Sequence, residues 1–274
     1  MALLLVVIST NGQSVSNYLF STNNVSSLNR TAGSLIDDID MNTGTTIHVG
    51  GSQNNSTSAT QPIGFDFFVN GTRQTTFNVT SNGWVSIGGF ASAFYGFLNV
   101  AAGVRVTPFL GTSGATGSMG TSSIGRVHSK VVGSQPNRVL VVEFLRMAIP
   151  ANTTNDTNTF QVRLYEATGS IEFVYGKMKV NSGAPLSFNT GFQFSSSLYQ
   201  HVNINTHTAS TSSSTPNNIA TNGSIASLDN ENLGSQRSYM WIPDPVSDAG
   251  AITVSNVTTT SMRLTWNDVA NEIG

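Results

Sequence analysis

Hydrophobic residues occupy every second position from Ile63 to Val69, and the positions between them are Gly64, Asp66 and Phe68. A period of two predicts a β-strand with one buried face. The dipeptide Asn70-Gly71 follows at once, and it suits a two-residue hairpin turn in which both residues adopt positive φ. A second turn signal at residues 81–83 leads into another apolar stretch. The pattern therefore predicts consecutive antiparallel strands at the centre of the chain.

Short apolar stretches with the same alternation recur as far as Ile242, separated by Gly, Asn and Pro turns. The apolar run 138–149 predicts a strand buried on both faces. Arg126, His128 and Lys130 alternate with less polar residues, which predicts that their side of a strand faces water. No stretch shows helical periodicity. We therefore expect an all-β fold, an antiparallel β-sandwich of the jelly-roll, concanavalin-like type, because the strands outnumber those of a seven-stranded immunoglobulin domain.

The chain divides into three expected parts: an N-terminal segment over residues 1–16, a jelly-roll sandwich over 17–243 and a C-terminal fragment over 244–274. Pro243 and Pro245 mark the second boundary, because two prolines this close cannot lie inside a regular element. The fragment resembles the first two strands of a fibronectin type III domain, in the sequence ITVSNVTTTSMRLTWND. The resemblance implies packing or interface roles for its apolar residues, which are Ile252, Val254, Leu264 and Trp266.

Composition narrows the classes of partner. Charged residues make up 9% of the chain, far below the roughly 25% of typical soluble domains. The formal net charge is −2, and without clustered Lys and Arg nucleic acid is a poor partner. The chain contains no cysteine, which excludes disulfides and thiolate metal sites.

The apolar run from Ala2 to Ile8 has two interpretations. It is too short for a transmembrane helix, which needs about 20 apolar residues. One interpretation is a truncated export signal that lacks its basic region. The other is an ordered β-strand lent to a neighbouring subunit, with interface residues Leu4, Val6 and Ile8 on one face.

Three further motifs carry a family resemblance: residues 63–67 (IGFDF), residues 81–84 (SNGW) and the hairpin sequence LYEATGSIEFVYG at 164–176. Together with the strand near Tyr18 they resemble the jelly-roll module of large secreted surface proteins of the Bacteroidota. Fibronectin type III domains commonly follow that module. The resemblance implies a secreted, extracellular location on a bacterial cell surface, and it implies no particular activity.

Candidate catalytic and metal-binding residues are few. Glu143, Glu166 and Glu172 fall on predicted strands and could supply a glycosidase carboxylate pair, although we expect water-facing side chains. Calcium is the one candidate cofactor, because acidic residues at two-residue spacing suit oxygen ligation; the candidate ligands are Asp37, Asp38 and Asp40. His201 and His207 would share one face of a strand, but they lie about 20 Å apart when extended.

An aromatic loop is the best candidate for recognition, since aromatic faces stack on sugars and anchor protein interfaces. A lid over the core, a subunit contact and a carbohydrate platform are its three interpretations; its residues are Phe90, Phe94, Tyr95 and Phe97. The chain also carries many N-glycosylation sequons. The candidate glycosylation sites are Asn24, Asn29, Asn54, Asn55, Asn70, Asn78, Asn152, Asn155, Asn222 and Asn256.

Three classes of function compete. The first is a non-enzymatic structural or adhesive surface protein, a homo-oligomer or the repeating subunit of a filament assembled by strand donation and sandwich-to-sandwich contacts. The second is a carbohydrate-binding module that takes surface glycans. The third is the accessory domain of a secreted hydrolase. We expect the first, because no nucleophile elbow or metalloprotease motif occurs in the sequence.

Overall fold

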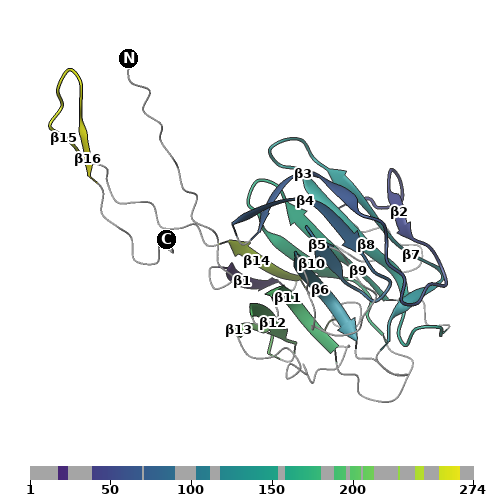
Figure 1. The fold of residues 1–274 in the computed structure, drawn as a ribbon. Coiled ribbons are helices and arrows are strands. Elements are labelled where there is room, and N and C mark those ends of the chain that lie inside the picture. The colour runs from purple at the N-terminus through teal and green to yellow at the C-terminus, as the bar shows by residue number, and fades with distance from the viewer. Residues whose placement is uncertain are drawn as a thin grey trace.

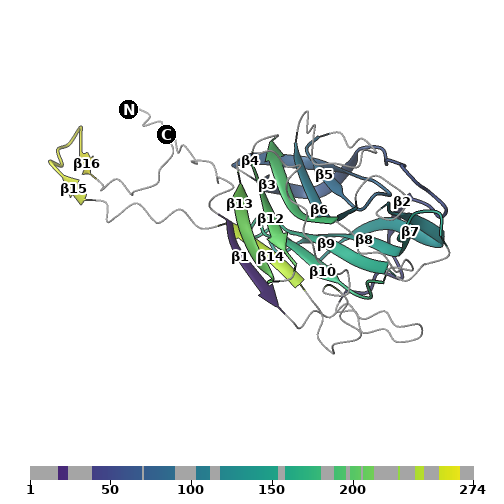
Figure 2. The same cartoon turned by 90° about the horizontal axis from the view of Figure 1, so that it is seen from below.

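The protein folds as a β-sandwich of two stacked antiparallel sheets, each with seven strands (Figures 1 and 2). The computed structural model describes residues 18–23, 39–69, 71–89, 103–111, 118–153, 158–179, 188–195, 198–204, 206–212, 228, 238–243 and 253–265. Within these ranges there is no helix, and so none that could cross a membrane. The predicted all-β antiparallel sandwich is therefore confirmed.

Sheet I contains the longest strands of the sandwich. Its strands, in spatial order, are β1 (Tyr18–Asn23), β14 (Ser238–Pro243), β10 (Ile171–Tyr175), β9 (Asn158–Tyr165), β8 (Val139–Ala148), β7 (Gly120–Val132) and β2 (Thr46–Val49). β8 is buried over nearly its whole length, as its mainly apolar sequence, interrupted by Glu143 and Arg146, predicts. The short strand β2 forms one edge of this sheet.

Sheet II packs against sheet I. Its strands, in spatial order, are β13 (Thr208–Ser212), β12 (Leu198–Asn203), β11 (Phe188–Ser195), β6 (Val104–Gly111), β5 (Val85–Ile87), β4 (Thr72–Val79) and β3 (Gln61–Val69). At one end of the sandwich the edge strands β1 and β13 approach each other, and Gln200 Nε2 donates a hydrogen bond to the Tyr18 carbonyl oxygen. β2 and β3 are the edge strands at the opposite end.

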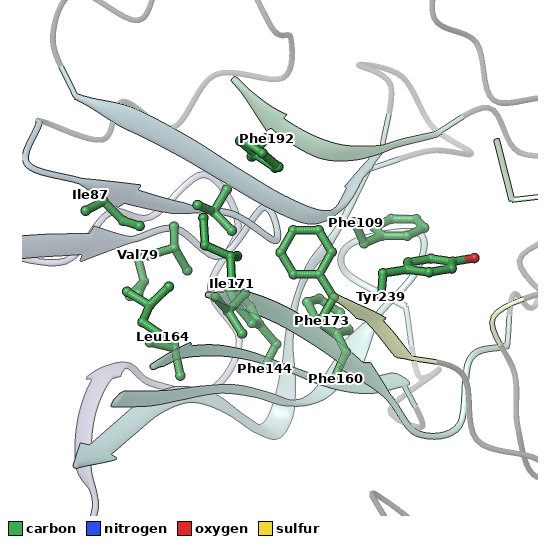
Figure 3. Packing of buried hydrophobic residues seen from close by; sticks show 14 of the residues in the cluster. Val79, Ile87, Phe109, Phe144, Phe160, Leu164, Ile171, Phe173, Phe192 and Tyr239 are labelled. Carbon is green, nitrogen blue, oxygen red and sulfur yellow. The ribbon is translucent and has the colours of Figure 1, made fainter. Parts of the chain in front are cut away.

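The core consists of the inward-facing residues of both sheets, which point toward one another in Figure 3. Phe144 and Phe160 stack with their ring centroids 4.7 Å apart, and Phe173 meets Trp241 edge-on at the same distance. Burial of one such side chain stabilises the fold by about 1.5–3 kcal/mol. The aromatic residues between the sheets therefore supply much of the energy that holds the two layers together.

The central hairpin has the predicted form. Val69 is paired with Thr72, as a two-residue turn between them requires, and Gly71 has the positive φ that this turn needs. Residues 81–83 turn β4 into β5 as expected. The register of β3 against β4 shifts between Pro62 and Phe67, an irregularity that the alternation of the sequence does not show.

The C-terminal part forms a separate two-stranded sheet of β15 (Thr253–Ser255) and β16 (Arg263–Thr265). Val254 and Leu264 are directly paired in it. The predicted strand pair is confirmed, whereas Ile252 and Trp266 lie outside the described residues. Whether this pair begins a fibronectin type III domain stays a prediction, as do the domain boundaries.

Candidate functional site at the open edge of the sandwich

A hollow of about 250 Å³ opens between the sheets where the edge strands β2 and β3 approach each other. Both sheets contribute to it, and its lining residues are Gly44, Thr46, His48, Gln61, Pro62, Phe77, Ser129, Lys130, Val131 and Leu140. Phe77 and Leu140 are almost completely buried and give the hollow an apolar floor. The hollow is therefore an opening into the core, with polar groups around it.

His48 is the central polar group of the hollow. Its Nε2 lies 2.7 Å from Ser129 Oγ, and its ring meets Phe77 edge-on at 5.5 Å. Partial burial lowers the pKa of His48, and the charge of nearby His128 lowers this pKa further. A lowered pKa favours the neutral imidazole. Two polar atoms of the wall, His48 Nε2 and Ser129 Oγ, thus already bind each other.

Contacts between the sheets flank the hollow. At one end Arg138 Nη1 donates to the Gly64 carbonyl oxygen at 2.9 Å, and a Cβ on Gly64 would lie 3.0 Å from the Val131 side chain. At the other end, in the loop 50–60, the backbone N–H of Ser52 donates a hydrogen bond to sheet I, and the backbone N–H of Ser58 donates one to sheet II. The edge strands β2 and β3 border the entrance to the hollow between these contacts.

The strands around the entrance expose backbone and apolar side chains. Among the described strands, β2 pairs only with β7 and β3 only with β4. Ile47 is 58% exposed, Phe68 48% and Val131 39%. An unpaired edge with exposed apolar residues is a template for pairing with another strand.

A buried polar network lies on the outer face of sheet I beside this edge. His128 Nε2 is 2.8 Å from Glu143 Oε2, and both side chains are completely buried. Gln161 Nε2 donates to Glu143 Oε1 at 2.9 Å. The prediction that His128 and Glu143 face water is therefore wrong: they do lie on the outer face of the sheet, but that face is covered.

The network holds the loop 39–45 against β7. His128 Nδ1 lies 3.0 Å from Thr45 Oγ1, and Lys130 Nζ donates to the carbonyl oxygens of Asp40 and Thr43. The Thr45 hydroxyl, the His128 imidazole and the Glu143 carboxylate follow one another in the order that activates a nucleophile. Here the imidazole is fully buried, and its hydrogen bonds join the loop to the sheet. The loop in turn supplies Gly44 to the hollow.

The other two candidate carboxylates each have their own partner. Glu166 Oε2 accepts from Arg138 Nε at 2.7 Å, and this hydrogen bond lowers the pKa of Glu166. Glu172 Oε2 accepts from the Tyr165 hydroxyl at 2.6 Å and lies 3.8 Å from Arg163. Both carboxylates therefore lie on one hairpin, but each one binds a different partner.

The candidate calcium site is described only at Asp40, because Asp37 and Asp38 lie outside the described residues. The Asp40 carboxylate accepts hydrogen bonds from the backbone and side chain of Asn42 and from Thr43. The backbone bond from Asn42 is the largest cause of the lowered pKa of Asp40. Within the described ranges, no three His, Asp or Glu side chains gather around a common point. Calcium binding stays a prediction.

The structure changes the expectation for the histidine row and for one sequon. β12 ends at Asn203 and β13 begins at Thr208, so the single strand expected to carry His201 and His207 turns between them. Asn78 is completely buried and donates to Ser58 and Thr60, which leaves no space for a glycan in the folded protein. Asn152 and Asn256 are exposed.

Several predicted site residues lie outside the described part of the chain. These are the aromatic loop with Phe90, Phe94, Tyr95 and Phe97, the N-terminal Leu4, Val6 and Ile8, and the sequons at Asn24, Asn29, Asn70, Asn155 and Asn222. Sequence reasoning missed the hollow itself. The one signal for it is the single histidine in the short strand 46–49, and its partner Ser129 is 81 positions away.

The comparisons with known proteins give a family for this fold. A family model described as NIDO related matches residues 10–243, a span that includes both sheets of the sandwich. The searches of curated proteins and of solved structures give no match. NIDO-related domains are typically extracellular. The chain belongs to the NIDO-related family.

Proposed function

We propose that this protein is a non-enzymatic structural or adhesive component of the extracellular space, which joins copies of itself through the edges of its sandwich. The observation that carries this proposal is the open edge at β2, where backbone that no further described strand pairs, exposed Ile47 and an apolar-floored hollow coincide. An exposed sheet edge of this kind promotes aggregation of a monomeric protein. In an assembly, a strand of a neighbouring copy can pair with it.

Two further observations support the proposal. Membership of the NIDO-related family suggests an extracellular adhesive or structural role. The surface is also weakly charged, with 9% charged residues in the chain. Polar but weakly charged surfaces repel each other little, so copies can approach closely at physiological ionic strength.

The finer form of the proposal is a filament subunit. Copies that contact each other head to tail, without closing a ring, build an open chain. The resemblance to surface modules of the Bacteroidota favours a bacterial cell surface as the location of such a filament. The β15–β16 pair fits a following fibronectin type III domain, which would space the sandwich from its neighbour.

Electron microscopy and light scattering test the proposal. The purified chain, concentrated at neutral pH, is expected to form filaments or discrete oligomers whose fraction rises with protein concentration. An Ile47→Lys variant places a charge on the free edge and is expected to reduce assembly, whereas Ile124→Lys, at a similarly exposed site on β7, leaves assembly unchanged. A chain that stays monomeric at all concentrations and binds no surface would contradict the proposal.

A second candidate function is carbohydrate binding in the hollow. Its polar rim of Thr46, Gln61 and Ser129 around buried Phe77 offers the mixture of hydrogen-bonding groups and an aromatic face that small sugars use. A glycan array with the wild-type chain and a His48→Ala variant would separate the two functions. Binding of a defined sugar by the wild type alone would favour the module.

A further inference from the structure

We propose that the β2 edge receives residues 3–8 of a second copy as an added strand, with alternate side chains of that strand entering the hollow. This inference rests on the proposed function, because it names the partner and the contact through which copies join. The acceptor belongs to the described structure, and the donor is known from its sequence.

The acceptor offers the two elements that strand addition uses. Main-chain groups on a free edge provide hydrogen bonds, and a pocket beside the edge receives every second side chain. β2 pairs with β7 on one side only among the described strands. Thr46 and His48 line the hollow, while Ile47 between them is exposed on the outer side. A strand added about 4.8 Å from β2 would continue this alternation.

The hollow has room for apolar side chains above its apolar floor, although most of the residues around it are polar. An apolar cavity of about 150 Å³ holds a benzene molecule, so the 250 Å³ here has room for one or two branched aliphatic side chains. Phe77 and Leu140 form its floor. His48 and Ser129 already bind each other, so an apolar group could fill the space without taking away their hydrogen bond.

The donor sequence has the matching pattern. Residues 3–8 read LLLVVI, without charge, proline or glycine, and their Val and Ile residues favour strands. Alternate residues of an extended segment point to the same side. When Leu4, Val6 and Ile8 face the sandwich, Leu3, Leu5 and Val7 face outward beside Ile47.

The length of the connection favours a second copy over the same chain. β1 begins at Tyr18 and lies at the opposite edge of sheet I from β2. Six strand spacings of about 4.8 Å separate these edges by roughly 29 Å. The ten steps from Ile8 to Tyr18 span roughly 33–36 Å when fully extended. A segment that must also pass around the side chains on the sheet has little slack, whereas a neighbouring copy can approach the edge directly.

Cysteine cross-linking tests the inference cleanly, because the natural chain has no cysteine. Each position from Leu3 to Ile8 is replaced by cysteine in turn, and each variant is mixed with an Ile47→Cys chain and oxidised. Cross-strand neighbours lie within disulfide reach when they point to the same side. An Ile124→Cys chain is the matched acceptor control, since Ile124 is 54% exposed, against 58% for Ile47, and also belongs to sheet I.

The expected result is an alternating pattern. Cysteine at one or more of positions 3, 5 and 7 links to position 47 about tenfold more than to position 124, because a docked segment has a high effective concentration. Positions 4, 6 and 8 do not exceed the control. Equal linking to positions 47 and 124 would overturn the inference, and so would linking without alternation.

Two other outcomes separate this inference from the proposed function. Filaments without cross-links at position 47 would overturn the inference and leave the proposed function standing. Alternating cross-links in a chain that never forms filaments or adheres would support strand addition and contradict the proposed function. A chain that carries both Leu5→Cys and Ile47→Cys and closes on itself, as a monomer, would overturn the assignment to a second copy.

Discussion

Removal of the imidazole from His128 is expected to weaken the fold strongly. His128→Ala leaves Glu143 Oε2 without the donor that lies 2.8 Å away in a completely buried site. Loss of one partner from a buried histidine–carboxylate pair costs about 3–5 kcal/mol, because the carboxylate left behind keeps its desolvation penalty. The same substitution removes the contact with Thr45 Oγ1 and so loosens the loop beside the hollow.

Urea unfolding of the full chain measures this cost. The buried Trp84 and Trp241 report unfolding by fluorescence, and a loss of 3–5 kcal/mol at a slope of about 3 kcal/mol per molar urea lowers the midpoint by about 1 M or more. Arg73→Ala is the control, because the Arg73–Asp66 pair is more than half exposed on both sides and contributes about 0.2–1 kcal/mol.

The comparison of the two variants can refute the reasoning. If His128→Ala costs no more than Arg73→Ala, the buried network does not hold the outer face of sheet I. A His128→Ala/Glu143→Ala double variant extends the test. Because the buried carboxylate is then gone as well, its loss of stability is expected to be smaller than the sum of the two single losses.

Three further predictions concern His48, the turn before β5 and the sequons. The pKa of His48 is lowered from 6.5 in the fold, so the stability that it contributes is complete above pH 6.5 and is lost as pH falls through the lowered value. Urea unfolding measures this fall in stability, whose slope is at most about 1.4 kcal/mol per pH unit for one proton. His48→Gln should make the slope shallower. Gly83→Ala should cost about 1–3 kcal/mol in thermal unfolding, because Gly83 has φ +92° and a Cβ there would lie 2.2 Å from the Phe109 carbonyl oxygen; an unchanged Tm would contradict this. In a glycosylating secretory host, peptide mapping should find glycans at Asn152 or Asn256 and none at buried Asn78.

Local patterns in the sequence were enough to predict the strands and the tight turns. The alternation from Ile63 to Val69 and the turn signal after it depend on neighbouring residues, and the structure pairs Val69 with Thr72 in a hairpin. The apolar run of β8 likewise predicts burial on both faces. Such features are local because backbone geometry fixes the period of two and the turn.

The functional site could not be predicted in the same way, because distant residues build it. Alternation shows that His128 and Val127 lie on opposite faces of β7, but it does not show that the outer face is covered. His48 belongs to a four-residue strand, and its environment comes from Ser129 and Phe77 on two different sheets. The positions of such residues follow from sheet order, which the sequence pattern leaves open.

Hydrogen–deuterium exchange during assembly tests the central claim most directly. Peptides that cover Thr46–Val49 are measured in dilute monomer and in assembled protein, with peptides from β8 as an internal reference. Strand addition at β2 should slow exchange there on assembly, and a Val6→Asp/Ile8→Asp variant should abolish this protection. Assembled protein in which β2 exchanges as fast as in the monomer would contradict it.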